Sequence, residues 1–189
     1  MSLVKDLTKN RKNQTVFTLN DIVQLAESYR GARLYSALKY AVKTSDLIRL
    51  SRGIYSLNRE YSRQEFANKF RTPSYISLYT VLQEAGVLFQ PYISIYLVSG
   101  RSITTEIDNQ KYIYRKIKNE ILLNPTGIIT ESGASKAIPE RALCDVIYLE
   151  GNQYFDNLRQ INWEKAESLN TEVYFHNLGI SEFISKYAV

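Results

Sequence analysis

The stretch between residues 18 and 57 constrains the fold of this chain more than any other. It contains two short segments with helical periodicity separated by a turn at Gly31, and then two apolar-rich runs that meet at residues 51–53. Glycine supplies the permissive backbone that a tight corner between two helices needs. Gly53 can adopt the positive φ that hairpin turns often require. This order of helix, turn, helix and hairpin predicts a winged helix-turn-helix.

The two helices of this stretch have clear local signals. The first is expected to begin at Thr18, because a hydroxyl residue followed three places later by Asp21 resembles a capping box. The second is expected from about Ala32 to Lys43, where an apolar stripe repeats at helical spacing and can pack on the first helix. The stripe consists of Leu34, Ala37, Leu38 and Ala41. A further short helix is predicted within residues 1–15.

Seven side chains of the second helix and the hairpin form the predicted DNA-binding set. They are Arg33, Ser36, Lys39, Tyr40, Lys43, Arg49 and Arg52. In a helix-turn-helix the second helix enters the major groove and contacts bases mainly from its N-terminal turns, so Arg33, Ser36 and Lys39 are assigned to base edges. Tyr40 and Lys43 are expected nearer the backbone, and the two hairpin arginines at phosphates or the minor groove. The alternative is an ordinary solvated helix face, which is charged in most proteins.

The distribution of charge bears on these alternatives. The whole chain carries a formal net charge of +5. Residues 1–60 hold 11 Lys and Arg against 5 Asp and Glu, a net of +6, whereas the remainder holds 13 against 14, a net of −1. Such asymmetry favours a polyanionic partner for the N-terminal part, most often nucleic acid, and a different role for the rest.

The rest of the chain predicts an α+β domain. Residues 1–60 are assigned to the winged helix-turn-helix, residues 61–72 to a partly helical connection, and residues 73–189 to the second domain. The elements expected in the second domain are a helix from Pro73 to Gly86, strands at 92–98, 102–107, 111–117 and 127–130, a helix from Pro139 to Gly151, and weaker helices at 163–169 and 181–187.

Known catalytic and cofactor signatures are absent from the sequence. The eight glycines are dispersed and form no phosphate-binding motif, and the carboxylates lack the spacings of a nucleotidyltransferase or a restriction-type nuclease. Cys144 and His176 are the single residues of their types, which argues against disulfide and zinc chemistry. Ser99 and Ser132, each followed by Gly, have no histidine nearby in the sequence. We therefore expect no enzyme activity, no metal and no cofactor.

The sequence also bears on location and on the many aromatic residues. No segment approaches the 18 or so consecutive apolar residues that a membrane helix needs, and the first residues lack the apolar core of a signal peptide. A cytoplasmic protein is expected. The 15 tyrosines are interpreted mainly as core and interface residues, because those in predicted strands alternate with aliphatic residues.

Three segments resemble a known family. LIRLSRGIYSL, TPSYISLYTVLQEAG and SKAIPERALCDVIYL, with KYIYRKIK between the last two, resemble the antitoxin of AbiE-type abortive-infection systems, a type IV toxin/antitoxin group of winged-helix regulators. The resemblance spans about residues 18–149. It implies an N-terminal winged helix that binds inverted repeats upstream of its own operon. It also implies a C-terminal domain that opposes a nucleotidyltransferase toxin without forming a stable complex with it.

Two hypotheses follow from the sequence, and a third, an enzyme with an unfamiliar site, is supported only by Cys144, His176 and scattered carboxylates. The first is a DNA-binding regulator, the antitoxin and autorepressor of a toxin/antitoxin operon. The second is an interaction module that binds protein or RNA, with the winged helix used for docking. The resemblance assigns the C-terminal function to no single residue, and surface or helix-capping roles remain open for the charged residues of the matched segments. These are Arg115, Lys116, Lys118, Lys136, Glu140 and Arg141.

Overall fold

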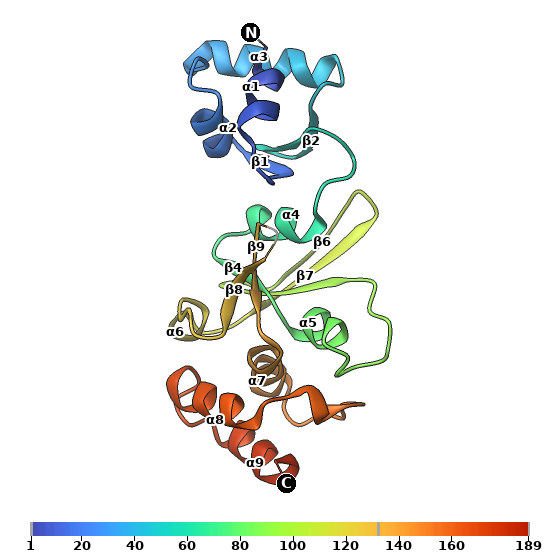
Figure 1. Cartoon of the computed structure of the whole chain (residues 1–189), viewed down its shortest axis with the longest axis vertical. Helices are drawn as coiled ribbons and strands as arrows, with labels where there is room; N and C mark the ends of the chain where they lie inside the picture. The colour runs from blue at the N-terminus through green and yellow to red at the C-terminus, as the bar shows by residue number, and fades with distance from the viewer. Residues whose placement is uncertain (1, 132, 189) are drawn as a thin grey trace. The chain divides into compact units, whose positions relative to one another are not determined.

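The computed structural model describes residues 2–131 and 133–188 and combines helices with two β-sheets (Figure 1). The chain divides into two compact units, Met1–Phe70 and Arg71–Val189. Residues 61–70, which the sequence assigned to a connection, thus belong to the first unit. Ser132, considered above for its neighbouring glycine, lies outside the described residues.

The first unit is built from helices on a small antiparallel sheet. Its elements are α1 (Leu3–Asn10), β1 (Val16–Thr18), α2 (Leu19–Leu25), α3 (Gly31–Lys43), β2 (Ile48–Ser51), β3 (Ile54–Ser56) and α4 (Arg63–Phe70). The strand order is β1-β3-β2, with both pairings antiparallel. The sequence did not predict β1, because three residues give too short an alternation to recognise and Thr18 also caps the next helix.

The local signals of the first unit are confirmed. The Asp21 N–H donates to Thr18 Oγ1 at 3.2 Å and the Thr18 N–H donates to Asp21 Oδ2 at 2.8 Å, which is the predicted capping box. In α3 the predicted stripe faces the core, with Ala37 partly buried and its other three members buried. The core also includes Leu3, Leu7, Phe17, Ile22, Leu47 and Tyr55.

Helix α4 is attached to β1 and α2 by a charged cluster. Glu65, 1% exposed, accepts hydrogen bonds from the Thr15 N–H at 2.9 Å, the Thr15 hydroxyl at 2.6 Å and the Val16 N–H at 3.2 Å. The Lys69 ammonium lies 3.0 Å from Glu65 Oε1 and 3.1 Å from Asp21 Oδ2. Helix α4 therefore stabilises β1 and also Asp21, which completes the capping box of α2.

The second unit contains a six-stranded mixed sheet. Its elements are β4 (Ser74–Ile76), α5 (Leu78–Glu84), β5 (Ile95–Ser99), β6 (Ile103–Ile107), β7 (Gln110–Lys116), α6 (Asn119–Leu122), β8 (Ile128–Glu131), β9 (Ala134–Ala137), α7 (Pro139–Glu150), a 3₁₀ turn (Leu158–Gln160), α8 (Trp163–Glu172) and α9 (Leu178–Tyr187). The strand order is β6-β7-β5-β4-β9-β8. The β5–β7 and β4–β9 pairings are parallel and the others antiparallel.

Helices α5 and α7 pack on one face of this sheet, and α8 and α9 pack on α7 (Figure 1). The side chains that bridge these layers are polar as well as apolar. The ring of Tyr79 on α5 lies 5.0 Å from that of Tyr96 on β5, and Arg115 on β7 forms an ion pair with Glu150 on α7. Aromatic and ionic contacts therefore both join the sheet to its helices.

Two predictions for the second unit are wrong in their boundaries. The helix expected from Pro73 begins at Leu78, because residues 74–76 form β4, which pairs with residues 97–99 of β5. The strand expected from residue 92 begins at Ile95, and Ile93 is 87% exposed. In both places a partner strand distant in sequence decides the structure.

Other predictions for this unit are confirmed. Helix α7 begins at Pro139 and ends before Gly151, whose φ is +81°. The β6–β7 hairpin and the two C-terminal helices lie where the sequence indicated. Strand β9 and helix α6 were not predicted. Within the described residues no helix combines the length and apolarity required to cross a bilayer.

Candidate nucleic-acid interface

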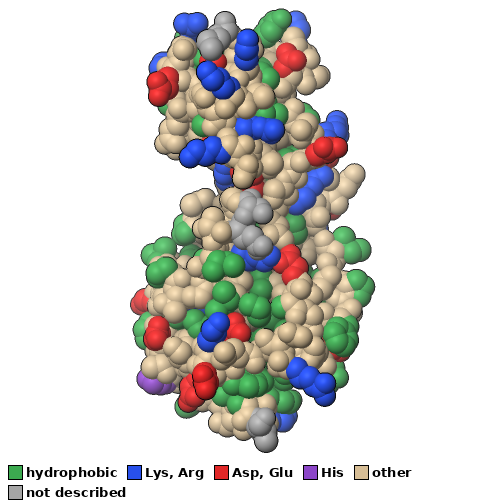
Figure 2. All heavy atoms as spheres, viewed as in Figure 1, with side chains coloured by type: hydrophobic (Ala, Val, Ile, Leu, Met, Phe, Trp, Pro, Cys, Tyr) green, Lys and Arg blue, Asp and Glu red, His purple; other side chains and the backbone are tan. Residues whose placement is uncertain are grey.

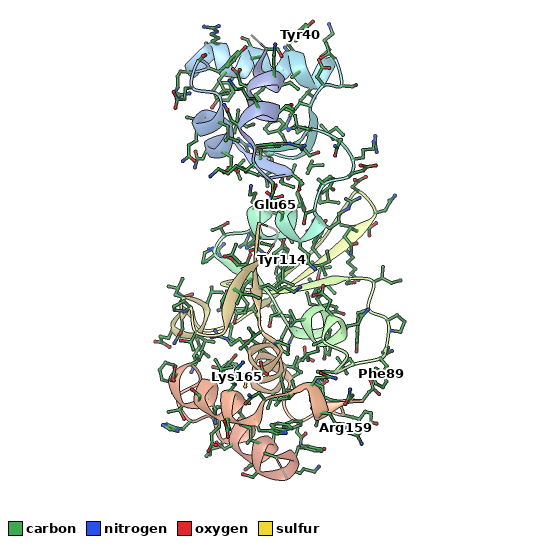
Figure 3. The ribbon with its side chains drawn as sticks, viewed as in Figure 1. Tyr40, Glu65, Phe89, Tyr114, Arg159 and Lys165 are labelled. Carbon is green, nitrogen blue, oxygen red and sulfur yellow. The ribbon has the colours of Figure 1, made fainter. Side chains whose placement is uncertain are left out.

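The candidate interface is centred on helix α3. All seven members of the predicted DNA-binding set have exposed side chains. Successive residues of a helix are about 100° apart, so Ser36, Lys39 and Lys43 lie opposite the buried stripe of α3. Arg33 and Tyr40 lie on one flank of that face. Figure 3 labels Tyr40, whose side chain is 67% exposed.

The β2–β3 hairpin contributes the other two cations. Gly53 has a φ of +77° in its turn, and its carbonyl oxygen accepts a hydrogen bond from the Leu19 N–H at 3.1 Å. This bond attaches the hairpin to the start of α2. Arg52 is exposed beside Gly53, and the Arg49 Nε donates to the Ser51 carbonyl oxygen at 3.4 Å, next to an irregularity in the strand pairing.

Ion pairs within the described residues do not balance the charge of this surface. Within the part of the chain that the structure describes, no ion pair involves Arg33, Lys39, Lys43, Arg49 or Arg52. The Arg33 guanidinium carbon lies 5.1 Å from the centre of the Tyr29 ring, a cation–π distance that leaves its charge uncompensated. An unpaired, exposed set of cations is suited to an anionic ligand.

The charge of the whole unit has the same sign. Residues 1–70 hold 13 Lys and Arg against 6 Asp and Glu, a net of +7, whereas residues 71–189 hold 11 against 13, a net of −2. Figure 2 shows Lys and Arg side chains recurring over the first unit, while hydrophobic side chains are prominent on the visible face of the second. The positive potential therefore originates in the unit that contains α3.

One exposed aromatic residue of α3 was missed by the sequence analysis. Tyr35 is 63% exposed and lies on the flank of the outer face opposite Arg33 and Tyr40. Its position directly after buried Leu34 places it off the apolar stripe, and this was the available signal. Tyr35 and Tyr40 thus bracket the polar face of the helix.

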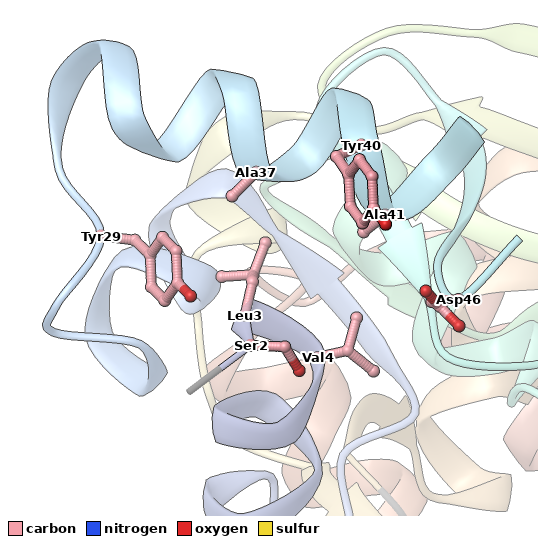
Figure 4. A pocket seen from close by; sticks show the side chains of 8 residues that line it. All are labelled: Ser2, Leu3, Val4, Tyr29, Ala37, Tyr40, Ala41 and Asp46. Carbon is pink, nitrogen blue, oxygen red and sulfur yellow. The ribbon is translucent and has the colours of Figure 1, made fainter. Parts of the chain in front are cut away.

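A groove runs beside this face, between α1 and α3 (Figure 4). Its volume is about 270 Å³, and Leu3, Ala37 and Tyr40 lie along it, with Tyr29 near one end and Asp46 near the other. The lining is mostly apolar, and its one carboxylate would repel an anion. The groove therefore differs from the cationic surface in its chemistry and is not suited to an anion.

The second unit buries a cluster of polar groups instead of exposing them. Asp145 and Arg141, both 0% exposed, lie on α7 with Arg141 Nε 3.9 Å from Asp145 Oδ1. Asp145 accepts hydrogen bonds from the hydroxyls of Ser77 at 2.6 Å, Tyr174 at 2.7 Å and Tyr75 at 3.1 Å. Arg141 donates to the Ile121 carbonyl oxygen in α6, to the Thr126 carbonyl oxygen in the loop that follows, and to the Tyr75 hydroxyl. The cluster ties α7 to the sheet, to α6 and to the segment after α8.

Burial also determines the ionisation of this cluster. It raises the pKa of Asp145, and the Arg141 charge with the three hydroxyl donors opposes that shift. Burial raises the pKa values of Tyr75 and Tyr174 well above the ordinary range. A surface role, which the sequence left open for Arg141, is wrong because no part of this side chain reaches solvent.

Neighbouring charges of the matched segment have structural partners as well. Glu140 is buried and its Oε1 accepts a hydrogen bond from the Asn162 N–H at 3.0 Å, at the start of α8. Lys136 forms an ion pair with Glu84. Arg115 is paired with Glu150, as described above. These contacts account for the charges without a ligand.

Catalytic arrangements are not brought together in the described residues. Cys144 is buried, and burial raises the pKa of its thiol, so it is a poor nucleophile. His176 is exposed on the loop before α9. Among the described residues, no three side chains of His, Cys, Asp and Glu are grouped in a way that would hold a metal ion.

Several tyrosines of the second unit are buried or packed against one another. Tyr112 and Tyr114 are buried. The rings of Tyr79 and Tyr92 stack at 4.7 Å, and Tyr96 meets both edge-on. Because these rings contact one another, they leave little face free for stacking on a base.

Comparison with known proteins adds no family assignment: no family model matches the sequence, and no curated protein matches it either. The functional interpretation therefore depends on the geometry and charge of the first unit.

Proposed function

We propose that the first unit is a winged helix-turn-helix that binds double-stranded DNA, with α3 as its recognition helix. The order of its elements supports this proposal, because α2 and α3 are joined by a short turn and followed by the β2–β3 hairpin. In this proposal α3 enters the major groove and the hairpin lies beside it as the wing.

The observation that carries the proposal is the unpaired cationic surface of α3 and the hairpin. Its five cations are exposed and lack ion-pair partners among the described residues. A solvated helix face with no ligand would be expected to intersperse both signs of charge. Helix α3 has six exposed or partly exposed polar or aromatic side chains on its outer side and no Asp or Glu in its sequence. Phosphate neutralisation is the simplest use of such a surface.

Individual roles follow from position. Arg33 and Ser36 lie in the N-terminal half of α3 and are assigned to base edges together with Lys39. Tyr40 and Lys43, closer to the C-terminal end, are assigned to the phosphate backbone. Arg49 and Arg52 in the wing are assigned to phosphates or the minor groove, and Tyr35 is added as a flanking contact.

The resemblance to AbiE-type antitoxins gives a biological context to this proposal. In that context the chain is a cytoplasmic autorepressor that binds inverted repeats upstream of its own operon and opposes a nucleotidyltransferase toxin without a stable complex. The near-neutral second unit, with its buried polar cluster, would carry the antitoxin role. Neither role requires the chain to be an enzyme or to hold a cofactor.

A binding titration with two duplexes tests the proposal. Fluorescence anisotropy is measured for the DNA upstream of the chain's own gene and for a shuffled duplex of equal length and composition. We expect tighter binding to the upstream duplex, by about a thousandfold or more for a specific regulator. Equal affinity for the two duplexes would contradict the regulator, and no measurable binding to either would contradict DNA binding itself.

A matched pair of variants assigns the binding to α3. Arg33→Ala removes a cation of the proposed interface, and Lys165→Ala removes an exposed cation of the second unit, labelled in Figure 3. We expect only the first to weaken binding. Equal losses in both variants would mean that the interface lies elsewhere.

A further inference from the structure

The free edge of β6 is a feature that DNA binding does not use. Strand β6 is the first strand of the six-stranded sheet and pairs only with β7 on its other side. Three of its five residues are exposed, and Ile103 is 37% exposed. Sheet edges are usually protected by Lys, Pro or a bulge. Strand β6 has no Lys or Pro, its single charged residue is Glu106, and its register with β7 is continuous.

The turn of the hairpin shows which main-chain groups face the free edge. Asp108 and Asn109 have φ values of +52° and +60°, as in a two-residue type I′ turn, so Ile107 and Gln110 form the first hydrogen-bonded pair. Alternate residues then point the same way, and those at 103, 105 and 107 direct their N–H and C=O groups to β7. Thr104 and Glu106 direct theirs away from the sheet. Within the described residues, no main-chain hydrogen bond reaches these outward groups.

We propose that β6 pairs antiparallel with β6 of a second copy of this chain, about a two-fold axis at Thr105. Two copies of one strand pair in this way only if residues whose main-chain N–H and C=O groups face outward lie opposite one another. This condition places the axis on a residue and not between two residues. Axes at 104, 105 and 106 are the three positions that pair more than one residue of β6 with its copy.

Side-chain chemistry selects among the three registers. An axis at residue 106 sets Glu106 opposite Glu106 of the second copy, which is destabilising. An axis at 104 sets Ile103 opposite Thr105 and leaves Ile107 beyond the partner strand. An axis at 105 pairs all five residues, sets Ile103 opposite Ile107 at both ends, and sets Glu106 opposite Thr104. This register gives the longest ladder, keeps like charges apart and joins apolar side chains.

The outward main-chain groups would accept any extended strand, but the side chains favour a second copy. In this register Ile103 meets Ile107 at both ends and Glu106 meets Thr104. In this register the outward N–H groups of Thr104 and Glu106 in one copy face the outward C=O groups of Glu106 and Thr104 in the other copy. The result is one continuous sheet through two second units, with isologous contacts. The proposal does not depend on DNA binding.

Disulfide trapping tests the register. In the proposed pairing Thr105 lies opposite itself in a non-hydrogen-bonded pair, with Cα atoms about 4.5 Å apart, within the range of a disulfide. Thr105→Cys should therefore form a covalent dimer on mild oxidation, and Thr104→Cys, whose symmetry mate is displaced along the strand, should not. Buried Cys144 provides no competing thiol. Cross-linking through residue 104 and not 105 would overturn the register.

Sedimentation of the unmodified chain tests the dimer itself. We expect reversible dimerisation between about 10 and 200 μM. Thr104→Pro removes an outward N–H and leaves the β7 ladder intact, and Thr105→Lys places like charges on the axis. Either change should weaken the dimer by about tenfold or more, while Thr104→Val should not. A wild-type chain that remains monomeric over the whole range, or variants that dimerise as well as wild type, would overturn the proposal.

Discussion

The two units use their charged residues in opposite ways. The first unit carries a net of +7 and leaves the five cations of α3 and its hairpin exposed, with no acidic partner among the described residues. The second unit carries a net of −2, buries Arg141 and Asp145 completely, and pairs Arg115 with Glu150. Exposed, unpaired charge contributes little to stability and is available to a ligand, whereas buried, paired charge constrains the fold.

Because of this difference, ligand affinity and folding stability should depend on different residues. Substitutions at the cations of the first unit should change ligand affinity and leave folding intact. Substitutions in the buried cluster of the second unit should do the reverse. Substitutions in either unit can test this contrast. The largest loss of stability is expected for the buried cluster of the second unit.

Arg141→Ala is expected to be the most damaging single change. It leaves the Asp145 carboxylate buried without its cation and removes hydrogen bonds to the Thr126 and Ile121 carbonyl oxygens. We expect a loss of about 3 to 5 kcal/mol in the free energy of unfolding. Urea unfolding followed by the fluorescence of Trp163, the single tryptophan, measures it in this unit.

Arg159→Ala, at an exposed arginine of the same unit, is the control for that change. It should leave the urea midpoint unchanged. Equal shifts for the two variants would contradict the distinction between buried and exposed charge.

Glu65→Ala tests the buried carboxylate that attaches α4 to β1. The change leaves the Thr15 and Val16 N–H groups without their acceptor and removes one of the two carboxylates beside the Lys69 ammonium. We expect a loss of about 2 to 3 kcal/mol, because several donors become unsatisfied at once. Far-UV circular dichroism during urea unfolding measures it, and Glu60→Ala, at an exposed position, should have no effect.

Arg33→Ala and Arg52→Ala should leave stability unchanged and weaken DNA binding. A loss of about 1 to 3 kcal/mol each is expected for direct contacts. Arg33→Lys should fall between wild type and Ala, because it keeps the charge and loses the planar group beside Tyr29. Anisotropy titrations measure the affinities, and thermal unfolding confirms the fold. Loss of the fold in either variant would assign these residues to stability.

The Cys144 thiol should be protected from chemistry in the folded chain. Burial removes access and raises the thiol pKa, so the reactive thiolate is scarce. A colorimetric thiol reagent at pH 8 should react slowly with native protein and rapidly in urea. Equal rates in both states would show that this part of α7 is open.

Local signals predicted much of the first unit. The capping box at Thr18 and Asp21, the stripe of α3 and the glycine turn of the hairpin all depend on residues close in sequence, and the structure contains each of them. Every member of the predicted DNA-binding set is exposed, although Tyr35 was missed. Strand β1 was missed as well, because its three residues are defined by pairing with β3.

The second unit was less predictable, because its structure depends on distant partners. Residues 74–76 follow a helix-like signal at Pro73, but their pairing with β5 makes them a strand. The spacing of Arg141 and Asp145 is typical of an exposed ion pair on a helix. Only the packing of Tyr75 and Tyr174 around this pair reveals that it is buried.

The salt dependence of DNA binding tests the central claim most directly. If Lys43, Arg49 and Arg52 each neutralise one phosphate, the logarithm of the binding constant should fall with the logarithm of salt concentration with a slope of about −3. Replacing Lys43 and Arg52 together by Ala should reduce that slope by about 2, and Lys165→Ala should not change it. An unchanged slope in the double variant would contradict the assignment of DNA binding to this surface.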